Sequence, residues 1–223
     1  EDGPVRTTVE ALFGLENSRA FLRYQLPKKG TGFRIEAGVH FMEKEKYLKL
    51  MFKLPKNNPP LTGQIMSGQI MFGREQLACG EETVSQKWVM VKNTAADQAL
   101  AVINNGTHGA DFEDDELGVT LLRSAGYTAS DFVMGKALQE EQWAPRMEQG
   151  ERFYQFFVQG GDIATLEEKI DRLAQQFNEE PYAFSYCPPG LREGLPTLLR
   201  IDNPRVIVSA FKKADTQEGY ILR

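Results

Sequence analysis

Apolar and polar residues alternate along several segments of this sequence, and this alternation is the feature that most constrains its fold. In Val5–Phe13 the odd positions are mostly apolar and the even positions mostly polar. Arg34–Phe41 repeats the pattern, and Lys49–Leu54 follows it less strictly. Successive side chains of a β-strand point to opposite faces, so the pattern is typical of strands that bury one face of a sheet.

Further short apolar segments are distributed along the rest of the chain. They are Phe21–Leu26, Gln64–Phe72, Lys87–Val91, Leu100–Ile103, Leu117–Leu122, Arg152–Val158, Arg205–Phe211 and Tyr220–Arg223. Turn-forming sequences such as Lys28–Gly32, Asn57–Pro60 and Asn104–Gly106 separate them. Many short strands at roughly even spacing indicate a sandwich or barrel rather than β-α-β units. We therefore predict an all-β fold.

One segment breaks the strand pattern. Thr165–Glu168 matches a capping box, in which the Thr165 hydroxyl and the Glu168 carboxylate satisfy free backbone N–H groups at the start of a helix. Apolar residues then recur at helical spacing, which predicts a short helix over residues 165–177. We expect the polar stretch Thr128–Gln149, which contains Trp143, to be a long loop.

Length and charge narrow the classes of function. The 223 residues fit one large β-sandwich, and no linker rich in Pro, Gly or Ser divides them, so we expect a single domain over residues 1–223. The formal charge is −5 and the Lys and Arg residues are scattered, which argues against a nucleic-acid binder. The sequence also lacks a run of about 18 apolar residues, which a membrane-spanning helix needs.

The two ends of the sequence resemble interior parts of a longer protein. Glu1–Pro4 has no starting Met and does not resemble a secretory signal, and Gly219–Arg223 reads as a strand without a polar tail. We therefore expect a fragment. Cys79 and Cys187 are too few for a disulfide scaffold, although one bridge stays open, and the low cysteine content favours a reducing compartment.

The sequence contains no recognisable catalytic motif. Its two histidines, His40 and His108, lie far apart, whereas a catalytic zinc ion needs three protein ligands. His40 occupies a polar position of its strand, where we expect it on the surface. No Gly-x-Ser-x-Gly motif is present, and neither cysteine lies in a reactive setting. We therefore expect no catalytic residue and no metal site in this chain.

Residues 104–112, together with the later Arg123, are the best candidates for contact with a ligand. Asn and Gly allow a tight left-handed turn here, which can direct His108 and Asp111 outwards. Arg123 ends an apolar strand, where its guanidinium can emerge at the rim of the sheet and donate hydrogen bonds to sugar hydroxyls. The alternative from the residues alone is a plain turn, a solvated acidic segment over Asp111–Glu116 and a surface arginine.

Short motifs occur in a characteristic order along essentially the whole chain. They are Gly3–Arg6, Tyr47–Leu50, Gln86–Val89, Ala101–Gly106 with His108–Gly109, Leu117–Ser124, Met147–Glu151, Gly160–Asp162, Pro204–Lys213 and Gly219–Arg223. As an ordered set they resemble the β-rich C-terminal region of glycoside hydrolase family 38 α-mannosidases, and the bacterial members most of all.

This resemblance implies a fold and an activity for the parent protein. The fold is a galactose-mutarotase-like supersandwich, in which two large antiparallel sheets pack face to face. Family members cleave α-linked mannose with retention, using a carboxylate nucleophile and a zinc ion held by a preceding α/β domain. None of those residues has a counterpart here. The resemblance also implies that Arg123 approaches the sugar cleft, with His108 and Asp111 in the adjacent loop as candidates for the same rim.

Three functions remain to be compared. The first is a non-catalytic domain that supports the N-terminal catalytic domain of a bacterial, cytoplasmic α-mannosidase and completes its cleft for an α-mannoside. The second is a free-standing carbohydrate-binding module, for which Trp143 is the available aromatic platform. The third is a mutarotase-like sugar epimerase, which requires His40 and His108 to converge.

The family resemblance favours the first function and leaves assembly into a homo-oligomer open. If a missing domain normally covers one face of the chain, an exposed apolar patch should be found there.

Overall fold

The computed structural model describes residues 1–54, 61–66, 68–72, 82–113, 115–126, 146–183, 185, 199–203 and 206–223. The chain divides into two compact units, residues 1–178 and residues 179–223, and each is described by itself. Cys79, Trp143 and Cys187 lie outside the described residues, as does most of the loop expected over Thr128–Gln149. The prediction of a single domain over residues 1–223 stays a prediction.

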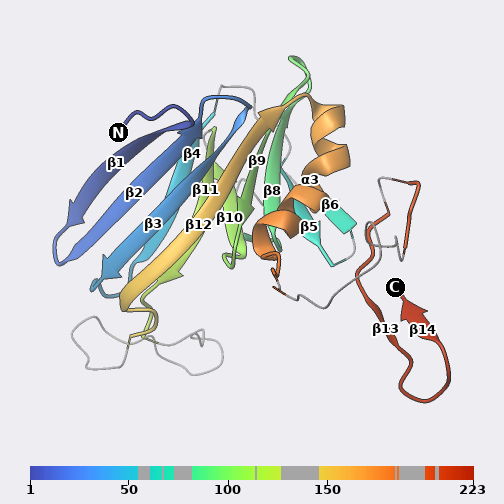
Figure 1. The fold of residues 1–223 in the computed structure, drawn as a ribbon. Helices are drawn as coiled ribbons and strands as arrows, with labels where there is room; N and C mark the ends of the chain where they lie inside the picture. Colours follow the sequence, from blue (N-terminus) through green and yellow to red (C-terminus); the bar gives the residue numbers. More distant parts are fainter. Residues whose placement is uncertain are drawn as a thin grey trace. The chain divides into compact units, whose positions relative to one another are not determined.

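The first unit is built around an antiparallel sheet of eight described strands (Figure 1). In spatial order these are β1 (Arg6–Leu15), β2 (Ser18–Pro27), β3 (Gly32–Phe41), β12 (Gly150–Gly161), β9 (Gln98–Asn104), β8 (Trp88–Asn93), β5 (Leu61–Ile65) and β6 (Gly68–Met71). Strand β12 comes late in the chain but lies between β3 and β9, so Phe156 pairs with Ile35 on one side and Asn104 on the other. This strand joins the N-terminal meander to the β8–β9 hairpin.

A smaller antiparallel sheet packs against one face of the large sheet. Its described strands, in spatial order, are β4 (Tyr47–Lys53), β11 (Glu116–Arg123), β10 (Gly109–Glu113) and β7 (Thr83–Val84). Strands β10 and β11 form a hairpin in which Phe112 pairs with Leu117. Strand β11 also pairs with β4, with a register shift between Thr120 and Leu122.

Apolar side chains between these two sheets form the main core. Ile35, Val102 and Phe156 of the large sheet belong to one cluster with Phe112 and Leu117 of the small sheet, and each is at most 3% exposed. Burial of a side chain of this size contributes about 1.5–3 kcal/mol to folding. The predicted all-β fold, with antiparallel sheets packed face to face, is confirmed.

The helix α3 (Ile163–Asn178) covers part of the other face of the large sheet, over β8 and β9 (Figure 1). Its buried residues Leu166, Ile170 and Ala174 pack against Trp88 and Ile103. Strands β8 and β9 are therefore buried on both faces, which explains why they read as continuous apolar runs. The helix predicted over residues 165–177 is confirmed. No helix in the described part of the chain is long and apolar enough to cross a membrane.

The start of α3 differs from the sequence prediction. Asp162 Oδ1 accepts a hydrogen bond of 2.8 Å from the backbone N–H of Thr165. The Thr165 hydroxyl and this N–H hold the pKa of Asp162 below its ordinary value. Asp162 is thus the N-cap residue, and the predicted capping box of Thr165 and Glu168 is wrong because the helix begins at Ile163.

Two predicted strands also differ from the structure. The apolar run Gln64–Phe72 is not one strand but part of the hairpin β5–β6, in which Thr62 pairs with Met71. Period-two alternation does not reveal a tight turn within such a run.

The second unit contains the hairpin of β13 (Phe211–Lys213) and β14 (Tyr220–Leu222). Arg205, the first residue of the strand predicted over Arg205–Phe211, lies outside the described residues. Of the described part, only Phe211 belongs to a strand, and β13 pairs with the three residues of β14. The rings of Phe211 and Tyr220 stack, with centroids 5.4 Å apart.

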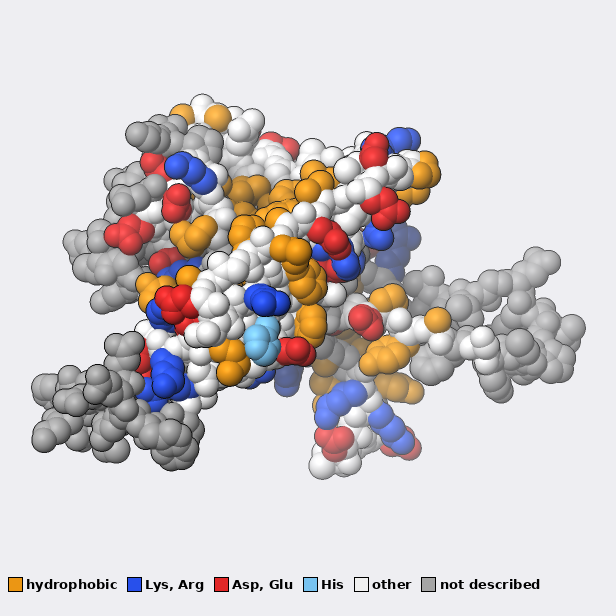
Figure 2. All heavy atoms as spheres, turned by 90° about the vertical axis from the view of Figure 1, so that its left-hand side faces the viewer, with side chains coloured by type: hydrophobic (Ala, Val, Ile, Leu, Met, Phe, Trp, Pro, Cys, Tyr) orange, Lys and Arg blue, Asp and Glu red, His pale blue; other side chains and the backbone are white. Residues whose placement is uncertain are grey.

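Strand β1 lies at one end of the large sheet and carries exposed apolar side chains on both faces. Leu12 is 86% exposed, Phe13 53% and Val9 51%. Figure 2, which looks onto the side of the molecule at the left of Figure 1, shows hydrophobic side chains in a band with charged side chains beside it. The backbone N–H of Thr8 donates to the carbonyl of Glu1, and the described residues provide no strand partner for the rest of this edge. An exposed apolar patch is therefore present, as the sequence predicts.

We expect Asp171→Ala to lower the free energy of unfolding by about 1–3 kcal/mol, because the buried indole N–H of Trp88 then loses its acceptor. In the structure Asp171 Oδ1 accepts hydrogen bonds of 2.8 Å from Trp88 Nε1 and from Gln64 Nε2. Urea denaturation followed by tryptophan fluorescence measures the change. Glu168→Ala, at an exposed position of the same helix, is the matched control and should stay within about 0.5 kcal/mol of wild type. Equal effects of the two substitutions would contradict the assigned role of Asp171.

Candidate functional site

The β10–β11 hairpin positions the three residues that the sequence singles out. His108 precedes β10, Asp111 lies within β10, and Arg123 ends β11. Phe112 faces the core, so its neighbour Asp111 points to the opposite side of the strand. The candidate site is therefore the outer face of the four-stranded sheet.

Asp111 is held in place by a lysine from β4, on the far side of β11 in the small sheet. Lys49 Nζ on β4 lies 2.6 Å from Asp111 Oδ2 and 3.4 Å from Glu82 Oε1. The side chains of Lys49 and Asp111 are only 10% and 14% exposed. Gly118, directly opposite Asp111, leaves the space for this carboxylate, since a Cβ there would lie 2.2 Å from Asp111 Oδ1. The expectation that Asp111 points outwards is correct, but the residue is packed rather than solvated.

The charges around Lys49 stabilise its protonated form. Burial acts to lower the pKa of Lys49, but the hydrogen bond and charge of Asp111, with those of Glu82, raise it above its ordinary value overall. The ammonium also lies 5.0 Å from the centroid of the Tyr47 ring, a favourable cation–π distance. Glu82 in turn accepts a hydrogen bond from the Thr120 hydroxyl. Lys49 therefore stays charged at neutral pH and holds Asp111 and Glu82 in a fixed network.

His108 is exposed at the end of the loop that enters β10. Asn104 Oδ1 accepts hydrogen bonds from the N–H groups of Gly106 and Thr107, at 3.0 and 3.1 Å. Gly106 has a φ of 145°, which confirms the turn that the Asn-Gly sequence predicts. The His108 Nδ1 atom lies 3.3 Å from the carbonyl oxygen of Ser85. This contact leaves the rest of the imidazole at the surface.

Arg123 is exposed at the end of β11, opposite Tyr47 of β4. Its backbone N–H donates a hydrogen bond of 2.7 Å to Glu148 Oε2, which fixes the end of the strand. Within the described residues its guanidinium has no ion pair or hydrogen bond. Arg123 is thus anchored through its backbone while its charged group stays available at the rim of the sheet.

The structure does not join the three candidate side chains by direct contact within its described part. Arg123 and His108 lie near the same end of the hairpin, because β11 ends where β10 begins. Asp111 lies further along the hairpin, opposite Gly118. His40 lies exposed on β3 of the large sheet, as expected, and the described contacts do not bring it to His108. The two histidines therefore give no support to an epimerase site.

The sequence does not predict that two further residues, Lys49 and Glu82, belong to this network. Lys49 pairs with Asp111 and with Glu82, and all three residues lie far apart in the sequence. The available signal was the alternation in Lys49–Leu54, which places Lys49 on the polar face of its strand. Nothing in that local pattern identifies the partner of Lys49. Among the described residues there is also no group of three or more His, Cys, Asp or Glu side chains that could hold a metal ion.

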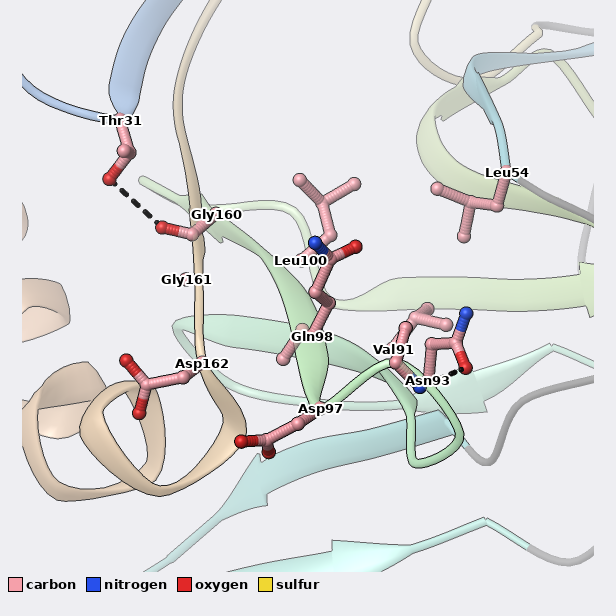
Figure 3. A pocket seen from close by; sticks show the side chains of 12 residues that line it. Thr31, Leu54, Val91, Asn93, Asp97, Gln98, Leu100, Gly160, Gly161 and Asp162 are labelled. Atoms are coloured by element: carbon pink, nitrogen blue, oxygen red, sulfur yellow. Dashed lines mark hydrogen bonds between the residues drawn. The ribbon is translucent and has the colours of Figure 1, made fainter.

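A cavity of about 700 Å³ lies near the start of α3, apart from the three candidate residues (Figure 3). Leu54, Val91 and Leu100 contribute apolar side chains to it. Figure 3 shows Asp162 and Asp97 at one end, where Asp162 already caps α3 and Asp97 lies in the β8–β9 turn. The cavity combines an apolar wall with polar groups that stabilise local structure.

The sequence model of the glycosyl hydrolases family 38 C-terminal domain matches residues 1–131. This match covers more than half of the chain, which therefore belongs to the family of glycosyl hydrolase family 38 C-terminal domains. The matched range runs from β1 to β11 and includes His108, Asp111 and Arg123. No curated protein matches the chain in sequence.

Two solved structures share the fold of this chain. One is described as a protein in the glycosyl hydrolase family 38 from Enterococcus faecalis, and the other as an alpha-mannosidase from Enterococcus faecalis V583. Each has a TM-score of 0.56 and 13% sequence identity and covers 70% of this chain. The chain spans 18% of the length of the first and 17% of the second. At this identity the likeness establishes the fold alone.

We expect Lys49→Met to lower the free energy of unfolding by about 2 kcal/mol, because Asp111 then loses its cation. This value lies between the effects typical of exposed ion pairs and those of fully buried ion pairs. Chemical denaturation measures the change. Lys46→Met is the matched control, since Lys46 pairs with Glu16 at 3.3 Å while 44% exposed. It should cost less than about 1 kcal/mol. A Lys49→Met protein as stable as the control would show that the network is not structural.

The contribution of Lys49 to the free energy of unfolding should also depend on pH. Because its pKa is raised on folding, the contribution is fully present below the ordinary lysine value of 10.5 and is lost as the pH rises through the folded-state value. The difference in unfolding free energy between wild type and Lys49→Met should therefore be constant through neutral pH and shrink in alkaline solution. A difference that instead shrinks in mild acid would assign it to another group.

Proposed function

We propose that this chain is the non-catalytic C-terminal domain of a retaining α-mannosidase, where it supports the catalytic domain and completes the cleft for an α-mannoside. The observation that carries the proposal is the family match over residues 1–131, which includes the β10–β11 hairpin and its candidate residues. The chain spans 18% and 17% of the similar solved structures, which agrees with a role as one part of a longer enzyme. We place that enzyme in the bacterial cytoplasm and leave its oligomeric state open.

In this proposal the reacting groups belong to the N-terminal catalytic domain of the same polypeptide. Retention requires two carboxyl groups about 5–5.5 Å apart, one acting as nucleophile and the other as acid and base. A catalytic zinc ion requires three protein ligands around an open position. The described residues of this chain do not fit a zinc site, so its ligands are assigned to the catalytic domain and no step is routed through the metal here.

Strand β1 provides a surface that suits packing against the rest of the enzyme. Val9, Phe13 and Leu15 alternate along one face of the strand and are 51%, 53% and 47% exposed. Beyond Thr8, the described residues leave the edge of β1 without a strand partner. Unpaired strand edges and contiguous apolar patches are both typical of interaction surfaces. We assign this surface to the contact with the catalytic domain.

In this proposal the chain contributes to the cleft by holding the substrate in position. The guanidinium of Arg123 carries five N–H donors and a permanent charge, so it can hold several sugar oxygens in a fixed orientation. Its cross-strand neighbour Tyr47 lies against Lys49, which is locked by Asp111. A rigid sheet therefore supports an arginine whose charged group is free to reach a substrate.

We expect this chain alone not to hydrolyse an aryl α-mannoside with added zinc, whereas the full-length enzyme should do so. The reason is that the reacting groups are assigned to another domain. Release of the aryl group, followed by absorbance, measures the activity of both proteins under identical conditions. Hydrolysis by this chain alone would contradict the proposal, provided that the activity persists in the presence of a zinc chelator and after the protein is purified again.

We expect Arg123→Ala in the full-length enzyme to lower kcat/KM for the aryl α-mannoside by about tenfold or more, because a hydrogen bond from a charged donor contributes about 1.5–3 kcal/mol. Arg152→Ala is the matched control, since Arg152 is also an exposed strand arginine, and should leave kcat/KM unchanged. Arg123→Lys should recover only part of the loss, because lysine lacks the planar set of donors. Unchanged kinetics with Arg123→Ala would remove Arg123 from the cleft while leaving the supporting role intact.

A further inference from the structure

A shallow groove of about 360 Å³ crosses β1, β2, β3 and β12 on the outer face of the large sheet. Its floor is one row of paired residues, in which Leu12 lies opposite Phe21, Phe21 opposite Gly38, and Gly38 opposite Phe153. Gly38 has no side chain, so the rings of Phe21 and Phe153 meet over it with centroids 6.5 Å apart. Phe153 is 73% exposed. The groove thus presents an aromatic surface to solvent.

A row of polar side chains borders this aromatic surface on one side. Arg19 lies opposite His40, and His40 lies opposite Glu151, so the three residues follow one another across β2, β3 and β12. All three are exposed and line the groove. In the described part of the chain their side chains form no hydrogen bond or ion pair with one another or with any other residue. Their polar atoms are available to a ligand.

The row on the other side of the aromatic surface behaves differently. There Arg23 Nε lies 2.6 Å from Glu10 Oε1, and Arg23 Nη1 lies 3.0 Å from Glu36 Oε2. These three side chains satisfy one another across β1, β2 and β3. The groove therefore has one flank with occupied polar groups and one with free polar groups, and only the second is suited to binding.

We infer that this groove binds a neutral saccharide of one or two pyranose units. One face of a pyranose ring consists of C–H groups, which pack on aromatic rings, and its edge carries hydroxyls. Phe153 and Glu151 are two residues apart on β12, a separation of about 7 Å, so a ring on Phe153 brings its hydroxyl edge to the polar row. That row spans two interstrand spacings, about 10 Å, which matches one or two sugar rings.

The polar row also selects for hydroxyl groups. Arginine only donates hydrogen bonds, a carboxylate only accepts them, and histidine can do both. A hydroxyl both donates and accepts, so a sugar satisfies Arg19, His40 and Glu151 together. An anion would pair with Arg19 but be repelled by Glu151, and the opposite charges of these two residues cancel. The volume of the groove lies near the lower end of the range for small-molecule sites.

This inference goes beyond the supporting role proposed above and is tested by binding rather than hydrolysis, so either can fail without the other. The probes are an α-linked mannobiose and maltose, titrated separately into the isotopically labelled chain and followed by NMR. We expect saturable shifts at Phe21, Phe153 and the neighbouring backbone with at least one disaccharide. Phe153→Ala should weaken binding about tenfold or more, because the aromatic surface is lost.

Three further variants separate a binding role from a structural one. Phe153→Tyr keeps the ring and should bind like wild type, and Arg19→Ala should weaken binding while leaving the unfolding midpoint unchanged. Val84→Ala is the matched control for truncation of an exposed apolar residue, since Val84 is 74% exposed on the other sheet. Absence of saturable binding by both sugars, or wild-type affinity in Phe153→Ala, would overturn the inference. Concentration-dependent self-association lost in Phe153→Ala, without sugar binding, would overturn it in favour of an interface between copies.

Discussion

The packing of the eight-stranded sheet against the four-stranded sheet is the interaction on which the rest of the structure depends. Each strand of the small sheet buries alternate residues, so the residues between them must face outwards. Phe112 is buried against the large sheet, which places Asp111 on the outer face, and Leu50 does the same for Lys49. The ion pair on that face is therefore a consequence of the register that the core imposes.

The second face of the large sheet is covered by a helix over only part of its extent. Where α3 covers it, Phe157 packs against Phe177 with ring centroids 6.2 Å apart. Four residues earlier on the same strand, and on the same face, Phe153 is 73% exposed. The helix is too short to cover the whole sheet, and β3 and β12 extend past it with polar residues such as His40. The part of this face that α3 leaves uncovered therefore presents an aromatic surface beside free polar groups.

Local sequence patterns predicted the strands well and their partners poorly. Alternation in Arg34–Phe41 identified β3, because burial of one face of a strand leaves a period of two in the sequence. The same reasoning could not place β12 between β3 and β9, since its pairing with β3 joins residues more than a hundred positions apart. Alternation in Val5–Phe13 identified a strand with an apolar face but could not reveal that this face lies uncovered. Likewise, the turn before β10 directed attention to Asp111, whereas its partner Lys49 is set by tertiary pairing alone.

The polar groups available to a ligand are those that the fold itself does not use. Asp111 and Lys49 satisfy each other at 2.6 Å while largely buried, so a sugar would have to compete with a strong internal pair. The guanidinium of Arg123 meets no such competition within the described residues, and neither do the side chains of the groove, such as Arg19. The three candidate residues therefore differ in kind. Asp111 is fixed within the outer face by its ion pair, and Arg123 keeps its guanidinium exposed at the rim of the sheet.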